Sequence, residues 1–493
     1  QYRSALTQPW PMRGSKGFQG VSVVATVIAL MTAPAGAETL SEALAKAYRT
    51  NPTLNGARAQ QRANDENVPI EKASGRPDIS VQGRYNEEIH RQSPVTTPRR
   101  NATATATLSV PLYSGGGVRN AINAAKLRVE AGQNSLRGSE SSLFSEVVAA
   151  YMDVIRDGAI VSFNRQNVSS LEVNLRASSD RFQVGDVTRT DVAQSESRLS
   201  LARADLQNAE AQLISSKERY IALVGSAPEA LETPPPLPGL PDSPESAVAV
   251  ALTDNPDILA TQKARNAARY DVKVAKAQAA PRVSAFVSGS YLDYLNSENP
   301  LITSPSNKDA TAGAQITIPL YQGGRPGALA RQSVARESQA IEQATEAERS
   351  IIAQTRSAYA SWRASLQSIE STRKAVEATA LSLEGVKAEN SAGTRTILDI
   401  LNAEQEALNA RVQLVTAERN AYVAGFTLLA AMGHAEARDL NIDAGPLYDP
   451  VVNYKRVRGK WFDYDFDATP KPVATNTRGT ATQTADIPPV AKP

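Results

Sequence analysis

Apolar and polar residues alternate along two pairs of segments, one pair in each half of the chain. In the first pair, residues 78–113, the apolar residues Ile79, Val81 and Tyr85 share one face of an extended segment, and residues 282–321 repeat the pattern. Alternation with a period of two predicts strands, either in a half-buried sheet or in a membrane barrel. The four strands cannot close a barrel alone, because the smallest barrels have about eight. A membrane location would therefore require several chains to share one barrel.

A second period, of seven residues, predicts long helices that pack as coiled coils. On the returning helix of the second half, alanines occupy one seam position, as at Ala410 and Ala417, and small residues there let helices approach closely. A single helix over residues 118–184 would be roughly 100 Å long, far beyond the size of an ordinary domain. The heptad positions of the first half are Val147, Val154, Val161, Val168, Leu175 and Phe182.

The two halves are copies of one unit. The segment from Pro111 to Gly116 reappears from Pro319 to Gly324, and from there onward matching residues stand 208 positions apart. A repeat of this length indicates duplication. We predict that each copy contains a helix, a strand pair and two long helices. The predicted parts are a first copy at 38–225, a proline-rich linker at 226–244 that is neither helix nor central strand, a second copy at 245–433, a C-terminal segment at 434–467 and a disordered tail at 468–493.

The N-terminus predicts an export signal. Arg13 and Lys16 precede an apolar stretch at residues 21–31, and Ala35-Gly36-Ala37 follows. A basic region, a short apolar region and a small-residue cleavage site make up a secretory signal peptide, here residues 1–37. If Met12 is the initiator, residues 1–11 lie upstream of it. The competing interpretation is a short core helix.

Composition argues against several classes of function. The 53 basic and 51 acidic residues leave a net charge of +2, so no overall field draws the chain to nucleic acid. The absence of cysteine excludes disulfides and thiolate metal sites. The two histidines, His90 and His434, are far apart, and no zinc, nucleophile-elbow or P-loop signature appears. We predict no enzyme, no metal and no cofactor.

Glycines mark turns at both ends of the predicted long helices. At the strand-to-helix turns, proline ends strand pairing and the glycines supply backbone freedom; a phosphate loop is the weaker interpretation because no Lys-Ser/Thr follows. Where the long helices reverse, Gly185 and Gly393 suit a tight turn. Asp191 and Asp399 come just after, where a negative charge favours a first helical turn. The strand-to-helix turns contain Pro111, Gly115 and Gly116 in the first copy and Pro319, Gly323 and Gly324 in the second.

With these motifs the chain resembles the TolC family, over about residues 39–433. The most specific pieces are the duplicated Pro-Leu-Tyr-x-Gly-Gly turns and the tip segment at 392–403. The resemblance implies an α+β membrane protein and a homotrimer. Each chain would give four strands to one twelve-stranded outer-membrane β-barrel, surrounded by outer-membrane lipid. Long antiparallel coiled-coil helices would form an α-barrel in the periplasm, and the short helices, the linker and residues 434–467 an equatorial belt.

The same resemblance implies a function and roles for the tips. The trimer would be a channel-tunnel that exports small molecules or proteins, coupled to a periplasmic membrane-fusion adaptor and an inner-membrane RND or ABC transporter. Arg395 resembles a latch residue that closes the entrance by bonding near Thr190 and Asp191 of a neighbouring chain. Asp399 resembles an acid of the pore constriction, which favours cations. The turns that resemble adaptor-docking tips contain Val184, Gly185, Thr188, Gly393 and Thr394.

Two positions depart from the family pattern. Asn402 stands where the family has a second pore acid, and Asn390 where it has a latch tyrosine. They predict a weaker acidic ring and a less tightly latched entrance. The alternative function is a structural periplasmic coiled-coil spacer or an adhesin without transport. Heptads fit both, but a spacer has no need for duplicated strand pairs, and an enzyme would require titratable clusters in a pocket.

Overall fold

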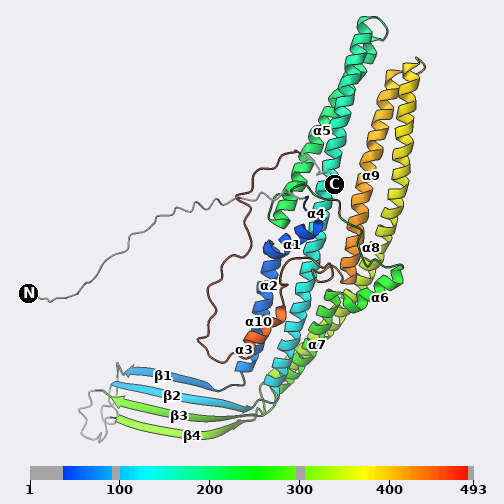
Figure 1. The fold of residues 1–493 in the computed structure, drawn as a ribbon. Coiled ribbons are helices and arrows are strands. Elements are labelled where there is room, and N and C mark those ends of the chain that lie inside the picture. Colours follow the sequence, from blue (N-terminus) through cyan, green and yellow to red (C-terminus); the bar gives the residue numbers. More distant parts are fainter. Residues whose placement is uncertain (1–36, 91–99, 296–305, 487–493) are drawn as a thin grey trace, which may run out of the picture. The chain divides into compact units, whose positions relative to one another are not determined.

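The computed structural model describes residues 37–90, 100–295 and 306–486. The predicted signal peptide, residues 1–37, lies outside this part but for its last residue. Two helical hairpins dominate the fold (Figure 1). In each, a helix of 67 residues is followed by one of 36: α4 (Gly117–Gln183) and α5 (Arg189–Val224), then α8 (Arg325–Ser391) and α9 (Ile397–Met432). Each longer helix spans roughly 100 Å, and the equal lengths confirm the duplication.

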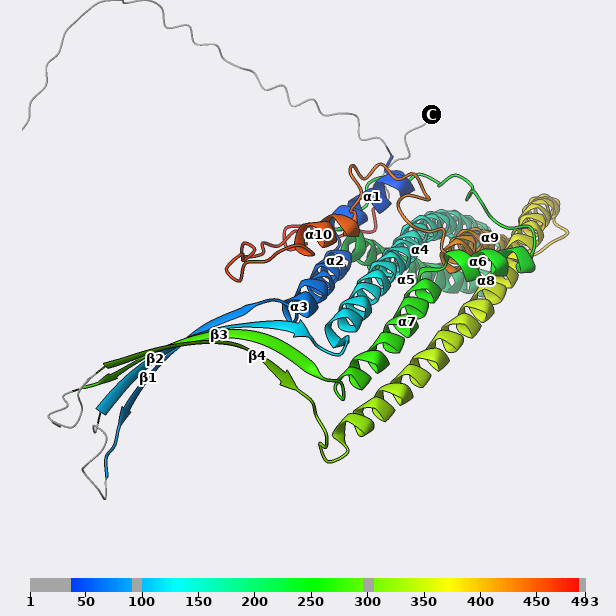
Figure 2. The same ribbon diagram turned by 90° about the horizontal axis from the view of Figure 1, so that it is seen from below.

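Shorter helices pack along the long ones. They are α1 (Leu40–Thr50), α2 (Pro52–Asp65) and α3 (Asn67–Ala73) in the first copy and α6 (Pro244–Asp254) and α7 (Pro256–Ala277) in the second, with α10 (Pro450–Val457) beyond it. The single helix α7 corresponds to the pair α2 and α3. Pro69 explains the break at Glu66, because its ring clashes with the carbonyl four residues back and it has no N–H to donate. Figure 2 shows α2, α4, α7 and α8 side by side in a curved row.

The main apolar core lies where α1 packs on the first hairpin. Phe144, Val147 and Tyr151 of α4 are fully buried there, together with Leu213 and Tyr220 of α5. The predicted heptad position explains this, because Val147, Val154 and Val161 stand on the same side of α4 and all three are buried. The second hairpin is more open, and only three residues of α8 are buried.

The strands form one antiparallel sheet in the order β1-β2-β3-β4. They are β1 (Asp78–Glu87), β2 (Arg100–Tyr113), β3 (Arg282–Tyr294) and β4 (Ser306–Thr317). The first two pair from Asp78 with Ser109 to Glu87 with Arg100, and β2 and β3 join the two copies of the unit. Within the described ranges, no helix is both long and apolar enough to cross a membrane.

The C-terminal part of the chain packs against the first copy of the unit. Asn453 of α10 donates a hydrogen bond of 2.7 Å to the buried Asp65 of α2, and Figure 2 shows α10 beside α2. We predicted disorder for residues 468–493. Their described part, to Asp486, contains no helix or strand but contacts the first hairpin. Lys217 Nζ donates to the carbonyls of Thr484 and Asp486 at 2.7 Å each, and Arg165 donates to that of Ala485 at 3.1 Å.

Candidate functional site: the sheet and the helical tips

The two faces of the sheet differ in polarity because the register aligns the alternating residues of all four strands. Ile79 lies opposite Leu108, Leu108 opposite Val287, and Val287 opposite Ala312. The next row on this face joins Val81, Ala106, Gly289 and Ala310, whereas the row between them, on the other face, joins Ser80, Thr107, Ser288 and Thr311. An apolar face backed by a polar one is the pattern of a transmembrane strand, with lipid on one side and an aqueous lumen on the other.

Tyrosines stand at both ends of the strands. Tyr85 and Tyr291 lie near the end farthest from the helices, and Tyr113 lies at the helical end of β2. Tyr321 follows β4 and is 88% exposed. Aromatic girdles of this kind mark the two membrane–water interfaces of outer-membrane proteins.

The strand-to-helix turns are built from the predicted glycines. Gly115 and Gly116 have φ values of 64° and 78°, and Gly323 and Gly324 have 60° and 80°. These left-handed conformations are accessible to glycine without strain, and in each turn the second glycine is the N-cap of the long helix.

Pro111 does not end its strand as we predicted. Pro111 lies inside β2 and still pairs with Ser284, with a register shift before Tyr113. Pairing with β1 has ended by then, so the missing N–H of Pro111 leaves no hydrogen bond to that strand unmade. Pro319 lies two residues beyond the end of β4 at Thr317.

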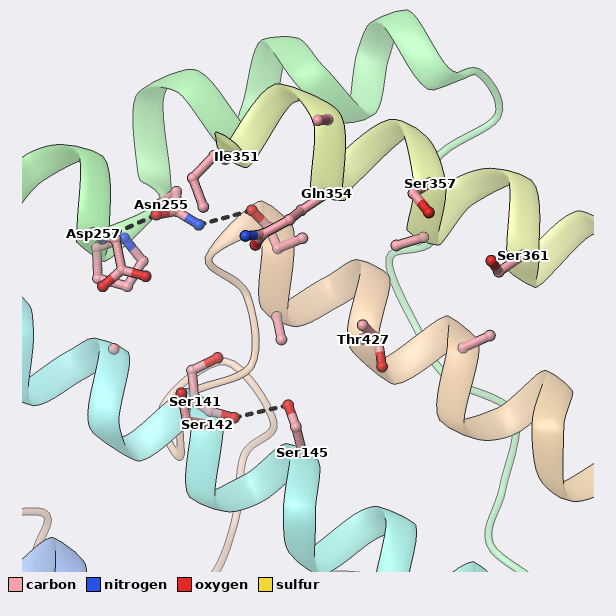
Figure 3. Close-up of a pocket in the computed structure, with 17 residues that line it drawn as sticks. Ser141, Ser142, Ser145, Asn255, Asp257, Ile351, Gln354, Ser357, Ser361 and Thr427 are labelled. Atoms are coloured by element: carbon pink, nitrogen blue, oxygen red, sulfur yellow. Dashed lines mark hydrogen bonds between the residues drawn. The ribbon is translucent and has the colours of Figure 1, made fainter. Parts of the chain in front are cut away.

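A cavity of about 880 Å³ lies between the two helical hairpins (Figure 3). Serines from α4 and α8 line it, and Asp257 at the start of α7 points toward it. Partial desolvation at the cavity raises the pKa of the Asp257 carboxyl, although the residue as a whole is exposed. Among the described residues, no group of acids and histidines could hold a metal ion; His434 instead lies 3.2 Å from Asp254.

The first tip joins α4 to α5. Val184 ends α4, Gly185 turns the chain with φ 83°, and Thr188 caps α5. The Thr188 N–H and hydroxyl both donate to Asp191 Oδ2 at 2.8 Å. These bonds lower the pKa of Asp191 below its usual 3.8. Its Oδ1 accepts no hydrogen bond from the described residues. Thr190 is exposed on the first turn of α5.

The second tip repeats this geometry. Gly393 has φ 81°, Thr394 follows it, and Thr396 caps α9. The Thr396 hydroxyl and N–H donate to Asp399 Oδ2 at 2.7 and 2.9 Å, which lowers the pKa of Asp399. Both acids therefore have a capping role beside any role in a pore.

The side chains around Asp399 have partners that the sequence did not suggest. Arg395 Nε donates to Glu389 Oε2 at 2.8 Å across its own turn, and its guanidinium is 3.9 Å from Asp399. Asn402 accepts a hydrogen bond of 2.8 Å from Arg198 of α5, so it links the two hairpins. Because Glu389 precedes Arg395 by only six residues across a tight turn, the sequence could have predicted their ion pair. No pattern in the sequence predicts the contact between Asn402 and Arg198.

The comparisons agree with this architecture. The family model of outer membrane efflux proteins matches residues 43–226 and 247–434, that is, both copies of the repeat. The chain belongs to the outer membrane efflux protein family. It is 36% identical over 426 residues to the outer membrane efflux protein BepC of Brucella suis, covering 86% of this chain and 91% of BepC. It is 24% identical to the outer membrane protein TolC of Vibrio cholerae over 86% of this chain and 97% of TolC.

Solved structures show the same fold. The crystal structure of the outer membrane protein VceC of Vibrio cholerae matches with a TM-score of 0.69 at 22% identity, covering 80% of this chain and 96% of VceC. The predicted fold, long antiparallel helices with four strands per chain, is confirmed. Membership in the family makes this protein an export channel of the outer membrane that extends into the periplasm, and a transport conduit rather than an enzyme.

Proposed function

We propose that three copies of this chain form one channel-tunnel, which exports its cargo together with a periplasmic membrane-fusion adaptor and an inner-membrane RND or ABC transporter. The main support for the proposal is that the four-stranded sheet has two unpaired edges within the chain, β1 and β4. β1 and β4 are paired on one side only within the chain, and an unpaired edge inside a bilayer is costly. They run in opposite directions, so β4 of one copy can pair antiparallel with β1 of the next until the barrel closes.

The helical tips are the proposed docking sites for the adaptor. They lie at the far ends of the long helices from the sheet (Figure 1), and Val184 is 80% exposed there. The docking residues of the two tips are Val184, Gly185, Thr188, Gly393 and Thr394. Residues 434–467 are proposed to belong to an equatorial belt with the short helices and the linker. The cargo, small molecules or proteins, depends on the partner pump.

The proposed latch is an exchange of partners by Arg395. In the single chain Arg395 pairs with Glu389. In the closed trimer it would instead reach Asp191 and Thr190 of the neighbouring copy, where Asp191 Oδ1 accepts no bond from the described residues. Because the two partners compete, removal of Glu389 should favour closure, and removal of Arg395 should favour opening. Asp399 is proposed to line the constriction, and Asn402, bonded to Arg198, adds no charge to it.

Single-channel conductance in a planar bilayer tests this proposal. We expect small, long-lived, cation-preferring steps, which grow in Arg395→Ala and shrink in Glu389→Gln. Arg203→Ala is the matched control, because Arg203 pairs with Glu172 along the first hairpin and away from the tips, and it should leave the steps unchanged. Equal conductance in all four proteins would refute the latch, and silence despite confirmed insertion would refute the channel.

External protease separates the channel from a spacer or adhesin. In the proposed trimer, cleavage from outside the cell reaches only the loops expected near residues 92–99 and 296–307, most of which lie outside the described residues. A spacer or adhesin that projects from the surface would instead lose its long helices.

A further inference from the structure

Four aromatic side chains near the C-terminus are exposed together. The segment from Gly459 to Asp467, called here the aromatic loop, follows α10, and aspartates alternate with its aromatics. Clustered apolar groups on a protein surface mark a site of interaction with a partner or a membrane. The exposed fractions are 59% for Trp461, 82% for Phe462, 88% for Tyr464 and 79% for Phe466.

The aromatic loop lies level with the helical end of the strands. Arg76 places its guanidinium 4.4 Å from the centre of the Trp461 ring and donates to the Lys460 carbonyl at 2.8 Å. Arg76 precedes β1 by two residues. Since Asp78 pairs with Ser109, the same register places Arg76 level with Pro111, between the apolar rows of the sheet and Tyr113. The loop thus lies near the level of Tyr113, at the helical end of the membrane-crossing strands.

Ion pairs with Arg456 of α10 and with Lys460 neutralise two of the three acids of the loop. Arg456 donates to both carboxylate oxygens of Asp467 at 2.7 and 2.8 Å, which lowers the pKa of Asp467 to about 2. Lys460 lies 3.2 Å from Asp465. In the described part of the chain, Lys455 and Arg458 have no carboxylate partner. A surface with free cations and paired acids is suited to anionic headgroups.

From this placement we propose that the aromatic loop inserts into the periplasmic phospholipid leaflet of the outer membrane and anchors the channel there. Aromatic rings favour the headgroup level of a bilayer because they combine an apolar body with a polar or polarisable edge. The proposal rests on the outer-membrane location and not on coupling to an adaptor or pump. A second copy of the chain is the other possible occupant of this surface.

Tryptophan fluorescence tests the proposal. The chain has three tryptophans, and the double variant Trp10→Phe with Trp362→Phe leaves only Trp461. The matched control, Trp10→Phe with Trp461→Phe, leaves only Trp362 of α8, which packs against Tyr359 far along the chain from the sheet. Both full-length proteins are reconstituted in phosphatidylethanolamine and phosphatidylglycerol vesicles with brominated acyl chains. Phenylalanine keeps the loop aromatic in the control, and insertion is checked by conductance.

We expect brominated chains to quench Trp461 severalfold more than Trp362 and aqueous iodide to quench Trp461 little. Strong quenching by iodide with weak quenching by bromine would overturn the proposal, because the loop would then lie in water. Protection from both quenchers would also overturn it and assign the surface to an adjoining copy. Quenching of Trp461 by bromine in a protein that conducts poorly would still support the anchor and count only against the proposed transport assembly.

Discussion

The repeated strand-to-helix turn offers a test of how the copies join. In the first copy, a Cβ added to Gly115 would overlap the Cβ of Ala280 and lie 3.0 Å from the Ala277 carbonyl, at the end of α7. A Cβ added to the equivalent Gly323 would meet nothing within 4 Å in the single chain. In the single chain, no helix lies beside Gly323 in the way that the end of α7 lies beside Gly115. In the proposed trimer, α3 of the adjoining copy supplies such a helix.

The two alanine variants have predictable costs. A non-glycine residue in the left-handed region costs about 1–2 kcal/mol, and forcing a methyl group into a filled space costs about 1–3 kcal/mol more. Gly115→Ala should therefore lower the free energy of unfolding by about 2–5 kcal/mol. Gly323→Ala should lower it by as much in the assembled trimer, where the added methyl would meet Ala73 and Arg76 of the adjoining copy. Gly239 has φ 73° and open space around it, so Gly239→Ala should cost only the backbone strain of the left-handed conformation, about 1–2 kcal/mol.

Thermal dissociation and unfolding of the detergent-solubilised protein measure this difference, by native gel for assembly and by far-ultraviolet circular dichroism for helix content. We expect the unfolding temperatures of Gly115→Ala and Gly323→Ala to be lowered by a similar amount, and both to lie clearly below that of Gly239→Ala. Gly323→Ala should also impair assembly of the trimer. If Gly323→Ala behaved like Gly239→Ala while Gly115→Ala fell further, the adjoining copy would not continue the curved row, and the reasoning would be refuted.

Three further predictions concern single side chains. Tyr151→Phe should destabilise the fold by about 1–3 kcal/mol, because the buried hydroxyl donates to the Glu38 and Glu232 carbonyls. Its repeat counterpart Tyr359 is half-buried and donates to the Asp242 carbonyl in a solvent-exposed hydrogen bond, so Tyr359→Phe should cost under about 1 kcal/mol in the same unfolding assay. Asp399→Asn should weaken block by multivalent cations, and in the unmodified channel this block should persist at pH 3.8 and fade only as pH falls through the lowered pKa; equal block in both channels would contradict the constriction role. Folding raises the pKa of Asp257 above 3.8, so the protein is most stable, as far as this group is concerned, below pH 3.8 and loses stability as pH rises through the folded-state pKa. The unfolding temperature of Asp257→Asn should therefore decline less over that pH window than that of the unmodified protein.

Much of the fold follows from short-range patterns in the sequence. Alternation identified the four strands because their side chains divide between two faces, and the register keeps that division across the sheet. Heptads identified the long helices because the buried side of α4 repeats every seven residues. The proline rule was less accurate, since Pro111 stays paired with Ser284. A proline stops pairing only on the side to which its N–H would have donated, and the sequence does not tell which neighbour lies there.

The contacts of the tips and of the C-terminal part were harder to predict. Arg395 was expected to bond a neighbouring chain, and the bond to Glu389 within its own tip gives it a second partner. Asn402 was noted only as a missing charge, whereas its bond to Arg198 depends on how two hairpins from different halves pack. Such contacts join residues that are distant in sequence, and neither periodicity nor turn chemistry specifies them.

The divergence of the two copies follows from what each one contacts. The hairpins and tips keep equal helix lengths and the same capping bonds, because every hairpin occupies an equivalent place around the proposed tunnel. The short helices differ. Pro69 divides α2 from α3, and the buried Asp65 receives bonds from Gln61 and Asn453, whereas the equivalent position in α7 is the exposed Arg269. A single C-terminal segment per chain can cover only one copy of the unit, so only the first copy needs the side chains that hold it. The same asymmetry places the aromatic loop beside β1 and not beside β3, which would give a trimer three lipid anchors rather than six.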